Sequence, residues 1–242
     1  MTPDETLTET QQRPELPKHS LRDFLIAVPL MLAVGVAYLF ASHIWGEAPR
    51  WGLIGLGALG WWAALILRFP FIPLAKKMGD LERQGSFMAF LAGVCEESVR
   101  LGWVLLFGRS FTEALALGIG WGAIEVLFAI INGGVRIVLL SRDDEKARQA
   151  LAMLAEQGQL KETPGGWFVG AWERFFASAL HLGFTLLVAW QPWLVVLLLP
   201  AHGLVDLAIP KFMKRSVWLV EGIVTVVGAA ALLLGLTAFG QI

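Results

Sequence analysis

The sequence predicts an all-α protein, a bundle of about seven transmembrane helices with the N-terminus inside and the C-terminus outside. Three observations support this fold class. The 242 residues are 56% hydrophobic and only 16% charged, with a mean hydropathy of +0.64, which is well above the apolar content of soluble domains. Several windows approach the ~20 apolar residues that a helix needs to cross the hydrocarbon layer. Lysine and arginine are concentrated in alternate connecting segments, as in multi-pass proteins.

The predicted elements follow one another with short connections. A polar cytoplasmic tail, residues 1–23, precedes a single membrane domain, residues 24–242. The seven apolar windows of that domain are 24–45, 51–69, 87–107, 111–140, 167–190, 193–209 and 217–239. A cytoplasmic loop near 141–166 separates the fourth and fifth windows, and it contains a short predicted helix that begins at Asp143 to Glu145 and ends at Gly158.

The positions of the basic residues set the orientation. With the N-terminus inside, only Arg50 and Arg109 fall in outside turns, which agrees with the positive-inside rule. The inside segments contain Arg13, Lys18, Arg22, Lys76, Lys77, Arg83, Arg142, Lys146, Arg148, Lys161, Lys211, Lys214 and Arg215. Six tryptophans lie at window ends, where an amphipathic ring prefers the headgroup region: Trp45, Trp51, Trp167, Trp190, Trp193 and Trp218.

Composition also limits the class of protein. A single cysteine, Cys95, excludes an internal disulfide and a multi-cysteine metal site. The polar start of the chain does not resemble a signal peptide. We therefore expect an integral, multi-pass protein of the bacterial plasma membrane, with the lipid bilayer as its surroundings and no nucleic-acid partner.

Ionisable residues inside the third window are the first sign of function. A charge at the bilayer centre costs about 2.5–3.5 kcal/mol, so Glu96, Glu97 and Arg100 are expected to face a polar interior. Arg100 can reach either glutamate at helical spacing, but one arginine cannot neutralise both. Carboxylates about 4 Å apart repel by roughly 4 kcal/mol, so one should hold a proton near neutral pH unless another cation or a metal intervenes. Such a glutamate is a candidate general base, and a purely structural Arg-Glu clamp is the alternative.

Three later windows add further polar groups. Glu125 follows Gly118 and Gly122, which form a small-xxx-small face for close helix packing. His181 lies in the fifth window. In the sixth, the i, i+4 pair His202 and Asp206 could orient an imidazole or hold a water or a metal. Glu221, in the seventh window, lies near the inner boundary and could reach the interface.

These motifs, in this order, resemble the YhfC-type membrane peptidases, which are relatives of the PrsW and CAAX-processing glutamic intramembrane proteases. The resemblance covers roughly residues 87–206. It rests on the runs Glu96-Glu97-Ser98-Val99-Arg100, Gly120-Trp121-Gly122-Ala123-Ile124-Glu125, Glu173-Arg174 with His181, and His202-Gly203-Leu204-Val205-Asp206.

The resemblance implies that Glu96 activates water, in the electrostatic setting of Glu97 and Arg100, and that His202 with Asp206 forms the later pair. Two departures are visible. The arginine follows the glutamates at the PrsW-like spacing rather than the CAAX-processing one. The second motif has Trp121 where YhfC relatives usually have a histidine. Either His181 supplies the missing imidazole or activity is lost.

The expected function is therefore peptide-bond hydrolysis by carboxylate-activated water, with a membrane-associated or transmembrane peptide as substrate. Glu96, Glu97, Arg100, Glu125, His181, His202 and Asp206 are the expected site residues. No cofactor is certain, but a divalent metal, with His181 and His202 as candidate ligands, stays open. The alternatives are a non-catalytic membrane scaffold and a small proton-relay transporter.

Overall fold

The computed structural model describes residues 20–45, 48–156 and 166–242 apart from Lys214. Within them every regular element is helical, so the all-α prediction is confirmed. The α-helices are α1 Ser20–Ile44, α2 Trp51–Leu67, α3 Ile72–Lys76, α4 Leu81–Phe107, α5 Phe111–Ser141, α6 Glu145–Glu156, α7 Gly166–Trp190, α8 Val195–Phe212 and α9 Val217–Ala238. Two 3₁₀ turns, Phe69–Phe71 and Pro192–Leu194, precede α3 and α8.

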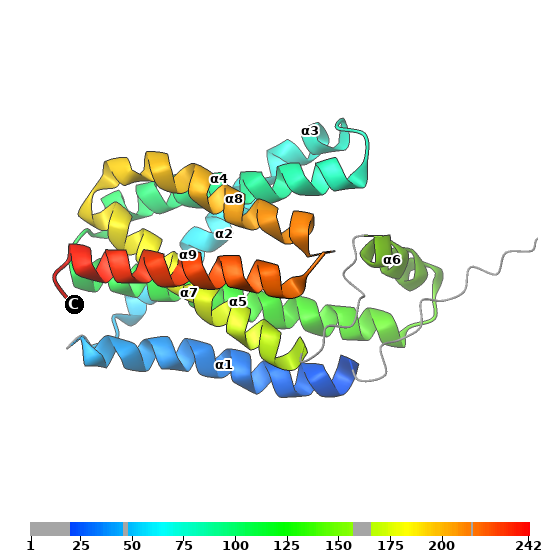
Figure 1. Ribbon diagram of the computed structural model, residues 1–242, viewed down its shortest axis with the longest axis horizontal. Helices are drawn as coiled ribbons and strands as arrows, with labels where there is room; N and C mark the ends of the chain where they lie inside the picture. Colours follow the sequence, from blue (N-terminus) through cyan, green and yellow to red (C-terminus); the bar gives the residue numbers. More distant parts are fainter. Residues whose placement is uncertain (1–19, 46–47, 157–165, 214) are drawn as a thin grey trace, which may run out of the picture.

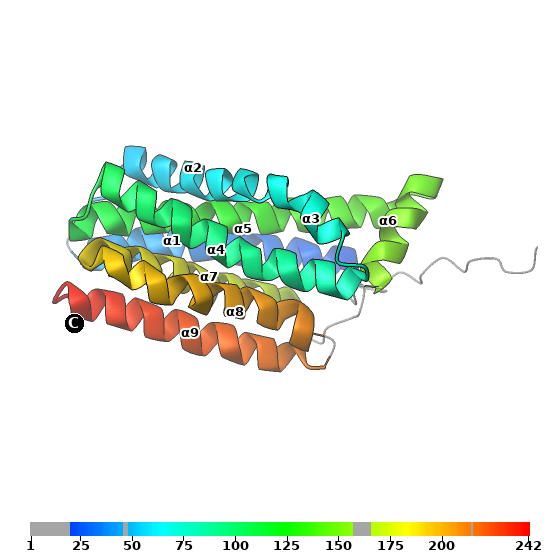
Figure 2. The same ribbon diagram turned by 90° about the horizontal axis from the view of Figure 1, so that it is seen from above.

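The long helices lie side by side, and consecutive ones run in opposite directions along the long axis (Figures 1 and 2). Helix α7 packs against α1, α5 and α9, while α4 packs against α2 and α8. The short α6 lies at the end of the bundle where α5 ends and α7 begins (Figure 1). Polar residues on α4, α5, α7 and α8 are therefore enclosed by apolar helices on several sides.

Five described helices are long and apolar enough to cross a membrane: Leu21–Ile44, Trp51–Lys76, Phe111–Ser141, Pro192–Ile209 and Val217–Ala238. The chain is thus a multi-pass membrane protein. The other two predicted spans correspond to α4 and α7, which contribute many of the buried polar residues. The count of seven spans and the orientation stay predictions. Residues 1–19 of the predicted tail and 157–165 of the predicted loop lie outside the described residues.

Local sequence signals explain where α4 and α5 begin. The side chain of Asp80 accepts a hydrogen bond from the backbone N–H of Arg83 and caps α4. Ser110 and Glu113 form a reciprocal capping box at the start of α5. Between them Gly108 ends α4 with a φ of 144°, a conformation that other residues avoid. These ends fix how far each helix extends and thus the depth of its polar residues.

Two glycine contacts bring the site helices together. A Cβ added at Gly118 would lie 2.9 Å from the Cα of Leu182, so α5 and α7 are in backbone-level contact there, as the small-xxx-small pattern predicts. A Cβ added at Gly93 would overlap the backbone of Gly203, which places α4 directly against α8 beside His202. Larger residues at these positions would separate the helices that carry the polar groups.

Candidate active site

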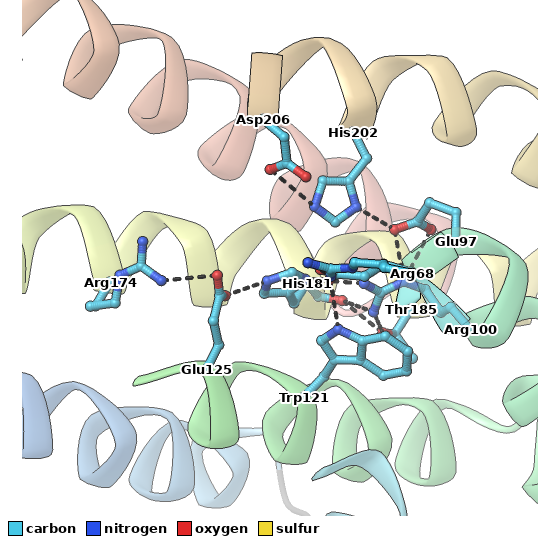
Figure 3. Close-up of polar contacts among 11 residues, drawn as sticks. Arg68, Glu97, Arg100, Trp121, Glu125, Arg174, His181, Thr185, His202 and Asp206 are labelled. Carbon is cyan, nitrogen blue, oxygen red and sulfur yellow. Dashed lines mark hydrogen bonds and ion pairs between the residues drawn. The ribbon is translucent and has the colours of Figure 1, made fainter. Parts of the chain in front are cut away.

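Polar side chains from α4, α5, α7 and α8 converge in the interior of the bundle, with an arginine from the end of α2 (Figure 3). The members are Arg68, Glu96, Glu97, Arg100, Trp121, Glu125, Arg174, His181, Thr185, His202 and Asp206. Among them Glu96, Glu97, Arg100, His181 and His202 are buried. All seven residues expected from the sequence lie in this one cluster, which we call the polar cluster.

Arg100 is the most completely engaged member. Its Nε donates to both carboxylate oxygens of Glu97 at 3.0 Å, and its Nη1 donates to the hydroxyl of Thr185 at 2.6 Å and to the carbonyl of His181 at 3.1 Å. The guanidinium lies 4.3 Å from the ring centroid of Trp121, a cation–π distance. A buried arginine is tolerated only with such partners, so Arg100 joins α4 firmly to α7.

His202 is held by Glu97 rather than by its own helix. Its Nδ1 lies 2.7 Å from the Oε1 of Glu97, which is hydrogen-bond distance. Asp206 Oδ1 lies 3.8 Å from the Nε2, too far for a hydrogen bond but within ion-pair distance. Glu97 therefore contacts Arg100 on one side and His202 on the other, while Asp206 acts on His202 electrostatically.

Glu96 has a second arginine as its cation. Arg68, the residue that follows α2, pairs with Oε1 of Glu96, and the indole N–H of Trp121 donates to Oε2 at 3.1 Å. Two arginines thus face the two adjacent glutamates, one each. From the sequence, Arg100 alone cannot neutralise both glutamates. Arg68 is the second cation, so each carboxylate has its own counter-ion.

The partners of His181 define its tautomer. Arg100 Nη2 lies 3.0 Å from Nδ1, and arginine can only donate, so Nδ1 carries the lone pair. Nε2 then carries the proton and donates to Glu125 Oε2 at 2.5 Å. Glu125 also pairs with Arg174 at 2.9 Å. Both ring nitrogens of His181 therefore have partners, and Nδ1 also lies 3.8 Å from Glu96 Oε2.

Four members of the polar cluster were not among the expected site residues: Arg68, Trp121, Arg174 and Thr185. Arg68 lies at the edge of an apolar window, Trp121 stands where YhfC relatives usually have a histidine, Arg174 belongs to the Glu173-Arg174 motif, and Thr185 gave no signal at all. The usable signs were an arginine next to a membrane window and an indole N–H at membrane depth, since both groups need partners there. Glu221, which from the sequence could reach the interface, is buried in the structure and lies outside the polar cluster.

A comparison with protein families matches residues 83–233 to the YhfC intramembrane metalloprotease family. The chain belongs to this family. The resemblance predicted from the sequence is therefore confirmed, and with it the general class of intramembrane protease. No curated protein and no solved structure matches the chain. Arg68 lies outside the matched residues, whereas the other members of the polar cluster lie within them.

The family description names a metal, and the polar cluster contains the ligand types that bind one, with Arg68 and Arg100 as competing cations at Glu96 and His181. Glu96, His181 and His202 each offer a ligand atom, all buried and all within 4.8 Å of one another. The 3.8 Å between His181 Nδ1 and Glu96 Oε2 is close to the ~3.4 Å between two ligands of a tetrahedral zinc ion. Each imidazole also has a nitrogen on a carboxylate, Glu125 or Glu97, the usual support of metal-binding histidines.

Proposed function

We propose that this chain hydrolyses peptide bonds of membrane-associated or transmembrane substrates, and that the reaction takes place at Glu96, His181 and His202. The observation that carries the proposal is the meeting of these three buried groups within 4.8 Å, in the interior of an apolar helix bundle. Buried acids and imidazoles at membrane depth are costly, and each is held here by specific partners. Groups preorganised in this way are typical of catalysis rather than packing.

In this proposal Glu96 removes the proton from the attacking water. Trp121 and Arg68 fix the direction of its carboxylate, and His181 Nδ1, which accepts from Arg100, lies 3.8 Å from Oε2. Because both ring nitrogens of His181 already have partners, Glu125 and Arg100, His181 positions the charged groups around Glu96 rather than donating to the oxyanion.

His202 is the better donor to the developing oxyanion. Its Nδ1 proton is held by Glu97, and the carboxylate of Asp206 stabilises a protonated Nε2. An N–H at Nε2 would be available to a peptide carbonyl placed between His202 and Glu96. Glu97 and Arg100 act as positioning residues, because they hold His202 and the backbone of α7 without facing the reacting atoms.

A divalent metal would be held by Glu96, His181 and His202, with Glu97 and Glu125 orienting the two imidazoles. The chemistry supplied by such an ion is polarisation of the scissile carbonyl and activation of bound water. Elemental analysis of the purified protein by inductively coupled plasma mass spectrometry separates the two mechanisms. A stoichiometric metal that is lost in His202→Ala supports the metal-dependent form, and a metal-free active protein supports the glutamate form.

The function is tested by mass spectrometry of membrane peptides from cells that express the chain or its Glu96→Gln variant. We expect new peptide C-termini only with the unaltered chain, each carrying one ¹⁸O after incubation in H₂¹⁸O, because hydrolysis adds one water oxygen. Glu145→Gln, on exposed α6, is the matched control and should cleave normally. Equal cleavage by Glu96→Gln and the unaltered chain would refute the assignment and favour the scaffold or proton-relay alternatives.

A further inference from the structure

Glu221, on α9, is a buried carboxylate outside the polar cluster. Its side chain is 2% exposed, and neither carboxylate oxygen has a hydrogen-bond partner among the described residues. A buried charge without a partner is strongly disfavoured. The mechanism proposed above does not use Glu221, so its presence needs a separate explanation.

Glu221 lines a cavity of about 390 Å³ between the first turns of α7 and α9. The walls are the rings of Phe168, Trp172 and Trp218, together with Gly222, Thr225 and Val226. The indole N–H of Trp172 donates to the hydroxyl of Thr225 at 2.8 Å, which fixes one wall. Both helices begin at the same end of the bundle, so the cavity lies close to one membrane boundary (Figure 1).

The charges around this cavity favour a cation. Glu173 and Arg174 are the charged groups that act on Glu221. Arg174 is already shared between Glu125, at 2.9 Å, and Glu173, at 2.5 Å. Glu125 and Glu173 therefore both use the one guanidinium, and Glu221 has no hydrogen-bonding cation of its own among the described residues.

The aromatic walls favour an organic cation. An ammonium group is attracted to the faces of tryptophan and phenylalanine rings, and a primary ammonium also supplies hydrogen-bond donors to a carboxylate. Trp218 and Val226 are exposed on the outer side of the bundle, so the cavity opens towards lipid rather than towards the polar cluster. Leu233, two turns beyond Val226, is also exposed and extends the apolar surface along α9.

We propose that this cavity binds the primary ammonium headgroup of a zwitterionic phospholipid of the ethanolamine type. The ammonium would pair with Glu221 between Trp172 and Trp218, and the acyl chains would lie along the exposed face of α9. Both lipids carry a phosphate, but an anionic glycerol headgroup lacks the ammonium that would pair with Glu221, so it is disfavoured. This site is independent of the proposed hydrolysis.

The proposal is tested by native mass spectrometry of the full chain, purified in detergent with equimolar phosphatidylethanolamine and phosphatidylglycerol. We expect preferential retention of the ethanolamine lipid. Glu221→Gln should reduce the preference about tenfold, the ratio for the loss of one charge-assisted hydrogen bond. Trp218→Leu should also weaken it, while Trp193→Leu, an equally exposed tryptophan outside the cavity, should not. A melting temperature for each variant in detergent shows that it is folded.

A second measurement distinguishes binding of the lipid from binding of a soluble amine. Ethanolamine added without lipid should not occupy the site at a concentration at which the lipid does, because it lacks the acyl chains. Saturation by soluble ethanolamine alone would overturn the lipid assignment. An unchanged lipid ratio in folded Glu221→Gln, or an equal loss in Trp193→Leu and Trp218→Leu, would overturn the site itself.

Discussion

Replacing Arg68 by glutamine should strengthen metal binding at the polar cluster. Arg68 pairs with Oε1 of Glu96, the carboxylate that, with His181 and His202, makes up the candidate ligand set. The guanidinium and a divalent ion therefore compete for the same carboxylate. Glutamine removes the positive charge but keeps a polar side chain of similar length, so the competition is lost while the packing is largely kept.

The magnitude follows from the burial of the pair, whose side chains are 15% and 7% exposed. Unit charges about 4 Å apart attract by roughly 4 kcal/mol at an effective dielectric constant of about 20. Water that hydrates the released guanidinium offsets part of this attraction. The net contribution of the pair is then about 1.5–3 kcal/mol, the usual value for a hydrogen bond to a charged group. The expected change is a Kd for Zn²⁺ that is about 10 to 100 times lower.

Isothermal titration of metal-stripped protein with Zn²⁺ measures this Kd directly. Arg83→Gln is the matched control, because Arg83 is exposed and pairs with Asp80 at the start of α4, away from the polar cluster. Glu96→Gln should weaken binding in either background. An unchanged Kd in Arg68→Gln would refute the competition, and Zn²⁺ binding that survives both Glu96→Gln and His202→Ala would place the metal elsewhere.

Three further predictions test other parts of the structure. Arg100→Met removes the arginine partner of buried Glu97, which keeps only His202, and should lower stability in detergent by about 3–5 kcal/mol, seen as a lower melting temperature; an unchanged value would contradict the buried pairing. Gly118→Ala should destabilise the bundle by about 1–3 kcal/mol through overpacking, whereas Gly102→Ala, with nothing near the added Cβ, should not; equal melting temperatures would argue against the close contact. The hydrogen bond from the Ala147 N–H holds the pKa of Asp144 below its ordinary value. Asp144 therefore caps α6 fully at pH values above the ordinary pKa of an aspartate, and the cap is lost as the pH falls through the lowered pKa of Asp144 in the folded protein. The amide shift of Ala147 should follow this titration, and Asp144→Asn should abolish it.

The sequence predicted the helices well, because the hydrocarbon layer imposes length and composition on each one. Boundaries of α5 and α9, for example, agree within a residue or two with the predicted windows. It also located the residues of the polar cluster, since buried charges must meet partners rather than lipid. Spacing along one helix, however, does not say which partner is chosen.

Partner choice depends on how the helices are rotated and how closely they approach. The i, i+4 spacing of His202 and Asp206 predicted that Asp206 orients the imidazole, yet Glu97 from α4 is the residue at hydrogen-bond distance. That contact needs the glycine-lined approach of α8 to α4, which no local pattern encodes. Arg68 escaped notice because a long side chain at the edge of a span can extend either to the interface or to the interior.

The polar cluster also has a directional property. From Glu125 through His181, Arg100, Glu97 and His202 to Asp206, a continuous row of acidic and basic groups crosses four helices. The two terminal carboxylates are 24% and 23% exposed, while the Glu97 and Arg100 side chains between them are almost completely shielded. The two ends of this row are therefore accessible to water, whereas its middle is shielded from water. A substitution at either end should therefore change the hydrogen bonding of the imidazole at the far end without contacting it.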